Sequence, residues 1–165
     1  DIVAKKEGQI VLNANGASQF TGNLVSDNAG SLVQVAYDNT SRVTGNATAS
    51  DSGIVKQTYS GDAVGAGNLY ANTGGQVQLN MSERSSLSGN MVTDATGSIS
   101  GNLSGNARYT GSTDASAGGG LVGVSMPTQD LQRWNQDGSN MKAELEKAIE
   151  AYNHRDRRYG LVKEE

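Results

Sequence analysis

Short runs of alternating apolar and polar residues recur along the first three quarters of the chain. Val77, Leu79 and Met81 alternate with polar residues in one run, and Ile10 and Leu12 do the same in an earlier run. A period of two residues is typical of a β-strand that buries one face. Apolar residues at helical spacing do not occur in this region, and its many glycines would destabilise helices. The pattern therefore predicts an all-β structure.

The same arrangement repeats about every 22 residues, and each repeat ends on a glycine. The closing glycines are spaced 23, 22, 22 and 22 residues apart: Gly22, Gly45, Gly67, Gly89 and Gly111. A second glycine lies eight positions into each repeat: Gly8, Gly30, Gly53, Gly75 and Gly97. A fixed period in this range is the signature of a repeat architecture. We expect a solenoid of about five to six turns that stack about 4.8 Å apart.

An asparagine follows four of the five closing glycines, at Asn23, Asn46, Asn68 and Asn90. Glycine and asparagine both tolerate positive φ, which suits the corners between strands. In a stack these four residues would form a ladder whose side chains bond from turn to turn. We interpret the column as structural, and a ligand-binding row of asparagines is the alternative.

The repeats share the form Gly-Asn, six residues, Gly, alternating apolar residues, and a final Leu or Val, Ser or Thr, and Gly. This pattern resembles the passenger domains of bacterial autotransporters, especially the adhesin-like class. The resemblance covers residues 1–125 and implies a right-handed parallel β-helix, secreted and held at the outer surface of Gram-negative bacteria. It implies adhesion, autoaggregation or a spacer role, with host or bacterial surface proteins or glycans as partners.

Composition divides the chain near residue 125. Residues 1–125 contain 20 of the 22 glycines and 15 of the 30 charged residues, which are 13 basic and 17 acidic in all. Pro127, the only proline, follows this boundary and marks a change of structural type. We therefore predict a repeat domain over residues 1–125 and a helical segment over residues 126–165.

The second region has the pattern of an α-helix between residues 139 and 154. Four apolar residues there form a stripe at helical spacing: Met141, Leu145, Ile149 and Tyr152. An isolated helix of this length is marginal in water, so the stripe is expected to dock on another surface. Three sites are open: the end of the solenoid, a partner or second copy, or a following domain that begins here.

Composition also excludes several classes of function. The net charge of −4 and the lack of a basic stripe argue against a nucleic-acid partner. The chain has no cysteine for disulfides or thiolate metal sites, and no apolar run approaches a membrane span. No nucleotide or calcium motif is present, so no cofactor is expected. The only histidine, His154, lies in the charged tail, which makes a serine hydrolase triad improbable.

One group of residues has possible chemistry. Asp27, Asp51 and Asp94 lie at the fifth or sixth position of their repeats, with Asn72 at the same place in another repeat. Stacked carboxylates can bind a cation weakly or supply the acid and base that cleave a glycan. Aspartate is also a common turn residue, and that role explains the same positions without activity.

The sequence therefore favours a non-enzymatic surface module that acts in adhesion or as a spacer. A second hypothesis is a glycan-active β-helix, such as a phage tailspike or a polysaccharide lyase. Five aromatic residues in residues 1–125 are few for such an enzyme, which needs sugar platforms. A third hypothesis is a filament subunit in which the ends of the solenoid stack.

Overall fold

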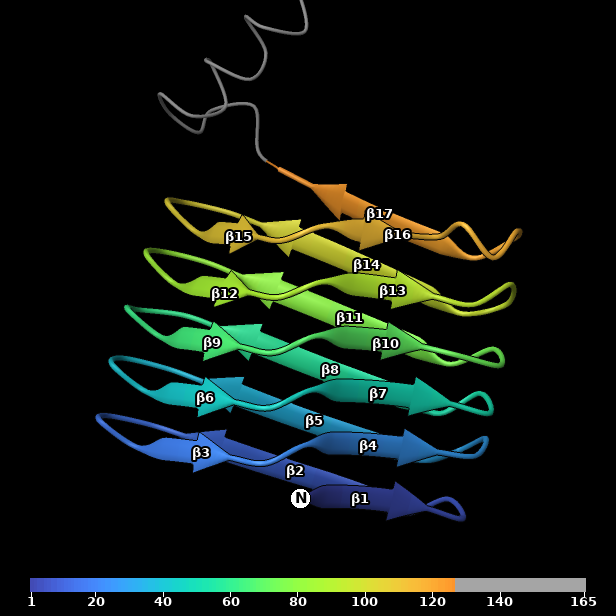
Figure 1. Cartoon of the computed structure of the whole chain (residues 1–165). Helices are drawn as coiled ribbons and strands as arrows, with labels where there is room; N and C mark the ends of the chain where they lie inside the picture. The colour runs from blue at the N-terminus through green and yellow to red at the C-terminus, as the bar shows by residue number, and fades with distance from the viewer. Residues whose placement is uncertain (127–165) are drawn as a thin grey trace, which may run out of the picture. The chain divides into compact units, whose positions relative to one another are not determined.

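The structure, a computed structural model, describes residues 1–126, which form a stack of three parallel β-sheets (Figure 1). Within these residues, every third strand along the chain returns to the same sheet. One circuit through three strands is one turn of the solenoid. The described residues make five full turns and a sixth turn of two strands. The predicted parallel β-solenoid is confirmed.

The three sheets are named A, B and C in the order in which the chain enters them. Sheet A contains β1 (Ile2–Lys5), β4 (Leu24–Asp27), β7 (Ala47–Ser50), β10 (Leu69–Ala71), β13 (Met91–Thr93) and β16 (Thr113–Asp114). Sheet B contains β2 (Gln9–Ala14), β5 (Leu32–Tyr37), β8 (Ile54–Tyr59), β11 (Gln76–Met81), β14 (Ser98–Leu103) and β17 (Leu121–Ser125). Sheet C contains β3 (Gln19–Thr21), β6 (Arg42–Thr44), β9 (Val64–Ala66), β12 (Ser86–Ser88) and β15 (Arg108–Thr110).

The predicted C-terminal helix and its stripe, Met141, Leu145, Ile149 and Tyr152, lie outside the described residues. The right-handedness expected from the family resemblance stays a prediction. The described fold is therefore the solenoid, and residues 1–126 contain no helix.

Corresponding residues of neighbouring turns stack directly on one another. In sheet B, Val33 pairs with Val55, and Val55 pairs with Val77. Backbone groups bond from turn to turn outside the strands as well, as where Ser52 N–H donates to the Thr73 carbonyl at 3.0 Å. With about 4.8 Å between parallel strands, six stacked turns span about 24 Å.

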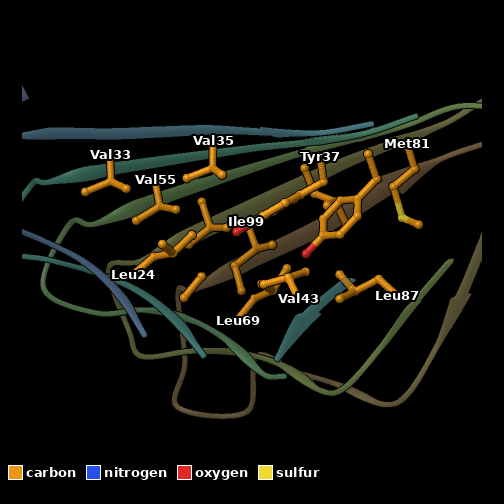
Figure 2. Packing of buried hydrophobic residues seen from close by; sticks show 14 of the residues in the cluster. Leu24, Val33, Val35, Tyr37, Val43, Val55, Leu69, Met81, Leu87 and Ile99 are labelled. Atoms are coloured by element: carbon orange, nitrogen blue, oxygen red, sulfur yellow. The ribbon is translucent and has the colours of Figure 1, made fainter. Parts of the chain in front are cut away.

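The core is a narrow apolar column enclosed by the three sheets. Side chains from sheet B, among them Val33, Val55 and Ile99, point toward Leu24 of sheet A and Val43 of sheet C (Figure 2). All five of these residues are at most 5% exposed. Each strand therefore buries alternate residues, which is the reason for the period of two in the sequence.

In the core of turn three, the large side chain of Tyr59 is matched by a glycine, Gly65. Tyr37 and Tyr59 stack with ring centroids 4.8 Å apart and an interplanar angle of 37°. A Cβ at Gly65 would come too close to the Tyr59 ring and to Leu87. The large tyrosine on β8 therefore requires the missing side chain on β9 of the same turn.

In the second repeat, the structure corrects the predicted alignment of the glycine that lies eight positions into each repeat. This repeat has 23 residues, and its extra residue lies in the loop between β4 and β5, because Leu32 pairs with Ile54. Ser31, not Gly30, therefore occupies the place of Gly53. Ser31 uses its side chain there, since its hydroxyl lies 2.8 Å from the Ser26 hydroxyl inside the stack.

Candidate functional site

The four predicted ladder asparagines lie in one column at the corner between sheets C and A. The Oδ1 atom of Asn23 accepts a hydrogen bond from the backbone N–H of Asn46 at 2.9 Å. Asn46 accepts in the same way from Asn68 at 2.8 Å, and Asn68 accepts from Asn90 at 2.9 Å. The bonds join side chain to backbone, whereas the sequence suggested side chains bonding to one another. Each bond satisfies an N–H at a corner where no strand partner is available.

The column extends beyond the four asparagines at both ends. A carboxylate oxygen of Asp1 accepts from Asn23 N–H at 2.8 Å. At the other end, Asn90 accepts from the Ser112 N–H at 3.1 Å and from its hydroxyl at 3.0 Å. Sequence reasoning did not assign Asp1 to the column, although it occupies the first position of its repeat. Any side chain that places an oxygen there can serve, so the position selects an acceptor rather than an amide.

Each closing glycine allows the backbone of its turn to approach the backbone of the turn below closely enough for this hydrogen bond to form. Gly45, Gly67, Gly89 and Gly111 have φ between 149° and 156°. A Cβ on any of the four would overlap the carbonyl oxygen of the closing glycine one turn below. The glycine therefore meets two demands at once, a positive φ and a close approach between backbones.

The three predicted acidic residues do not form one column. Asp27 pairs with Ser50 of the next turn, so Asp51 lies one residue beyond that position, in the loop after β7. Asp94 follows β13 in the fifth turn, whereas Asp27 lies in the second. Three turns separate Asp27 from Asp94 along the stack, which corresponds to about 14 Å. The residue count already places Asp51 at the sixth position of its repeat and Asp27 and Asp94 at the fifth, and the strand pairing keeps this offset.

Hydrogen bonds within the stack occupy the carboxylates of Asp27 and Asp94. Asp27 lies 3.4 Å from Lys5 Nζ and accepts from the Ser50 hydroxyl at 3.2 Å. Asp94 accepts from the backbone N–H groups of Thr96, Thr73 and Gly97 at 2.9, 2.6 and 2.8 Å. The pKa of Asp94 is lowered, first by the Thr96 N–H and then by the Thr73 N–H. Both residues tie one turn to the next.

Two further features are absent from residues 1–126. These residues contain no group of three or more His, Asp or Glu side chains that could hold a metal ion. They also contain no helix of the length and apolar character needed to cross a membrane.

The loops between sheets B and C carry a second set of ties that sequence reasoning missed. Arg84 binds Asp62 of the preceding turn through two hydrogen bonds of 2.7 and 2.9 Å. The pKa of Arg84 is raised, chiefly by the hydrogen bond to Asp62. Glu83 accepts from the Gly61 N–H, also across one turn. The sequence did contain a signal for this ion pair, because Asp62 and Arg84 are 22 residues apart, which is the length of one repeat.

Four side-chain polar atoms of the described residues are buried without a hydrogen-bond partner; they belong to Tyr37, Ser41, Gln57 and Thr93. Neither the Tyr37 hydroxyl nor the Gln57 Oε1 atom has a hydrogen-bond partner of ordinary geometry among the described residues. Burial raises the pKa of Tyr37, and the neighbouring Gln57 opposes this shift in part. Burial also raises the pKa of Tyr59, and the charge of an ionised Tyr37 would raise it further. Both phenols therefore stay neutral at physiological pH.

The outer faces of the sheets are mainly polar. An exposed column of small residues runs along sheet C: Thr21, Thr44, Ala66, Ser88 and Thr110. Large apolar side chains are exposed only at scattered positions of the described chain: Val3, Val11, Val64, Leu121 and Met126. These faces thus offer repeated hydroxyl and amide groups, together with charged side chains on sheets A and C.

No protein-family model matches this chain, and no curated protein or solved structure matches it either. The fold defines the class: the described residues form a parallel β-solenoid with a repeat of about 22 residues.

Proposed function

We propose that this chain is a non-enzymatic module of a bacterial surface protein, a rigid β-solenoid that serves in adhesion or autoaggregation and as a spacer. The observation that carries the proposal is the unbroken set of ties between successive turns. Three sheets, the asparagine column and the Arg84–Asp62 pair each join neighbouring turns. A stack held at several points around its circumference resists bending and shear, as a spacer requires.

The outer faces support a contact role. Exposed hydroxyl and amide side chains recur once per turn, so a partner that binds one turn finds similar groups on the next. Each contact is weak, but linked contacts raise the overall affinity by multivalency. Surface proteins or glycans, of the host or of other bacteria, are the partners proposed here.

The placement at a bacterial surface rests on the resemblance to autotransporter passengers described above. The repeat pattern of residues 1–125 supports this assignment, and so does the β-solenoid that it forms. Secretion and attachment to the outer membrane are part of the same proposal.

Display of the full chain on a non-aggregating bacterium tests the contact role. We expect displaying cells to settle faster in suspension or to bind glycan-coated and host-cell surfaces better than cells with an empty anchor. The matched control is Leu79→Asp, which places a charge at a core position that is 0% exposed and should disrupt the stack. Equal settling and equal binding by the displaying and empty cells would contradict the proposal.

A further inference from the structure

The loop between β2 and β3 in turn one combines an exposed asparagine with a glycine. Asn15 is the only asparagine of the chain that is directly followed by a glycine, Gly16. Both residues are exposed. A Cβ added at Gly16 would meet no atom of the described residues within 4 Å, so no neighbouring group crowds this side of the glycine. An asparagine followed by glycine can react with its own backbone, because the next peptide nitrogen can attack the side-chain amide.

The backbone N–H of Gly16 has no hydrogen-bond partner among the described residues. The strand pairing makes Asn39 and Gly61 the equivalent residues of turns two and three. In turn two, the Asn39 N–H donates to the carboxylate of Asp38. In turn three, the Gly61 N–H donates to the carboxylate of Glu83. Of these three equivalent nitrogens, the one that follows an asparagine is therefore the one that no hydrogen bond occupies.

Turn two shows how close the preceding side chain comes to this nitrogen. Asp38 is the equivalent of Asn15, and its Oδ1 atom lies 2.6 Å from the backbone nitrogen of Asn39. The Cγ atom bonded to that oxygen is therefore close to the same nitrogen. An Asn15 side chain in the same orientation places its amide carbon beside the Gly16 nitrogen. Reacting atoms held about 3–3.5 Å apart are in a near-attack arrangement.

We propose that Asn15 is a site of spontaneous deamidation. The Gly16 nitrogen loses its proton to hydroxide and forms a bond to the Asn15 Cγ atom. The bond from Cγ to the amide nitrogen breaks, and that nitrogen takes up a proton from water and leaves as ammonia. The cyclic imide that remains is opened by water at either of its two carbonyl groups, which gives aspartate or isoaspartate. The inference goes beyond an adhesive or spacer role, because the reaction needs only water and no partner.

The reaction changes the contact between turns one and two. The Gly16 carbonyl accepts from the Thr40 N–H at 3.1 Å and from the Thr40 hydroxyl at 3.3 Å. Isoaspartate inserts an additional carbon into the backbone directly before Gly16, which displaces this acceptor. Either product also places a carboxylate about 4.8 Å from the position of Asp38 in the next turn, and like charges at neighbouring positions repel. Deamidation therefore loosens this corner of the stack.

Mass spectrometry of the purified full chain, incubated at pH 8 in heavy-oxygen water, tests the proposal. Asn15 should yield both aspartate and isoaspartate, each with one heavy oxygen, because ring opening takes its oxygen from water. Asn106 is the internal reference, since it is exposed in the equivalent loop of turn five. The next N–H, that of Ala107, donates to the Ser104 carbonyl at 3.2 Å. We expect Asn15 to convert at least about tenfold faster than Asn106. Equal rates, or aspartate without isoaspartate, would overturn the proposal.

Gly16→Ala is the matched variant. Asn39 and Glu83 occupy the equivalent place with φ of 57° and 58°, so this loop accepts a side chain there. The added Cβ hinders the approach of the nitrogen to the Asn15 side chain. We expect conversion of Asn15 to slow by about tenfold in this variant. An unchanged rate would exclude attack by this nitrogen and would overturn the proposal.

The same chain unfolded in guanidinium chloride shows whether the loop permits the reaction. We expect the folded and unfolded chains to convert Asn15 at rates within about tenfold of each other, because the loop leaves the two groups close. A folded chain that reacts more slowly than this would overturn the proposal, since the loop would then hold the nitrogen and the amide apart.

Hydrogen exchange followed by nuclear magnetic resonance tests the effect on the stack. The Thr40 N–H should exchange faster in the deamidated chain than in the fresh chain. The Arg84 N–H, which donates to the Gly61 carbonyl at 3.0 Å in the same way two turns further on, should not change. Equal protection of the Thr40 N–H in both samples would refute the loosening of the corner.

Discussion

At the scale of single residues, the stack depends on a glycine and an oxygen acceptor at the corner where each new turn begins. The closing glycine permits the backbones of successive turns to approach, since a Cβ would overlap the carbonyl below. The next residue then accepts a hydrogen bond from the turn above. The hydrogen bond forms only where the two backbones approach closely. The closing glycine and the acceptor residue that follows it therefore recur together in each repeat.

Gly67→Ala should destabilise the solenoid by about 2–3 kcal/mol, because the residue has φ of 154° and no room for a Cβ. Urea unfolding followed by circular dichroism measures the change. Gly123→Ala is the matched control, because no atom of the described residues lies within 4 Å of a Cβ added there and its φ is not positive. Equal stability of the two variants would contradict the packing described for the corner.

Asn46→Ala should cost about 1 kcal/mol, because the Asn68 N–H loses its acceptor. Asn46→Asp should cost less, since a carboxylate oxygen accepts at the equivalent place at Asp1. Thermal unfolding at pH 7 distinguishes the two variants. If aspartate proved as damaging as alanine, the amide itself, and not its oxygen, would be what the column requires.

Alkaline pH should unfold the chain through its buried tyrosines. Burial raises the folded-state pKa of Tyr37 and Tyr59 above the ordinary value of about 10. Their stabilising effect is therefore complete below about pH 10 and is lost as the pH rises beyond it. The free energy of unfolding should fall between pH 8 and 11, and it should fall less steeply for the Tyr37→Phe variant. A steeper fall in Tyr37→Phe than in the wild-type chain would contradict this account.

At the scale of elements, loops between the strands also bond from one turn to the next. The loop after β13 is the clearest case, because Asp94 accepts from the Thr73 N–H one turn below and from two N–H groups of its own loop. Such loops both close the strand connection and bond to the neighbouring turn.

Acid should weaken this loop. The folded-state pKa of Asp94 is lowered, so its contribution is present above the ordinary pKa of about 4 and is lost as the pH falls through the lower folded value. Asp94→Ala should therefore reduce stability at pH 7 and have a smaller effect at pH 2. Acid titration of both proteins by circular dichroism checks this expectation, and an equal deficit at both pH values would refute it.

The elements could be predicted from the sequence because each strand carries its own period and each corner its own glycine. The loop details could not be predicted in this way. By a count of residues Gly30 aligns with Gly53, but the strand pairing places Ser31 there instead. Nor did the period indicate that Tyr59 fills the space left by Gly65, because that match joins two different strands of one turn.

At the scale of the whole described unit, the repeat separates two kinds of surface. Charged residues are on sheets A and C and in the loops, while the outer face of sheet B carries only Lys56. Since every turn adds one strand to each face, a bias at one repeat position becomes a property of the entire face. A stacked fold therefore builds extended contact surfaces from short sequences.

Electron paramagnetic resonance distances between spin labels along sheet C test the stacked architecture most directly. The chain has no cysteine, so Thr21, Thr44, Ser88 and Thr110 can be replaced in pairs and labelled. We expect narrow distributions that lengthen by about 4.8 Å per turn, with about 14 Å between residues 44 and 110 and about 19 Å between residues 21 and 110. Broad distributions, or distances that do not increase with the number of turns, would contradict the solenoid.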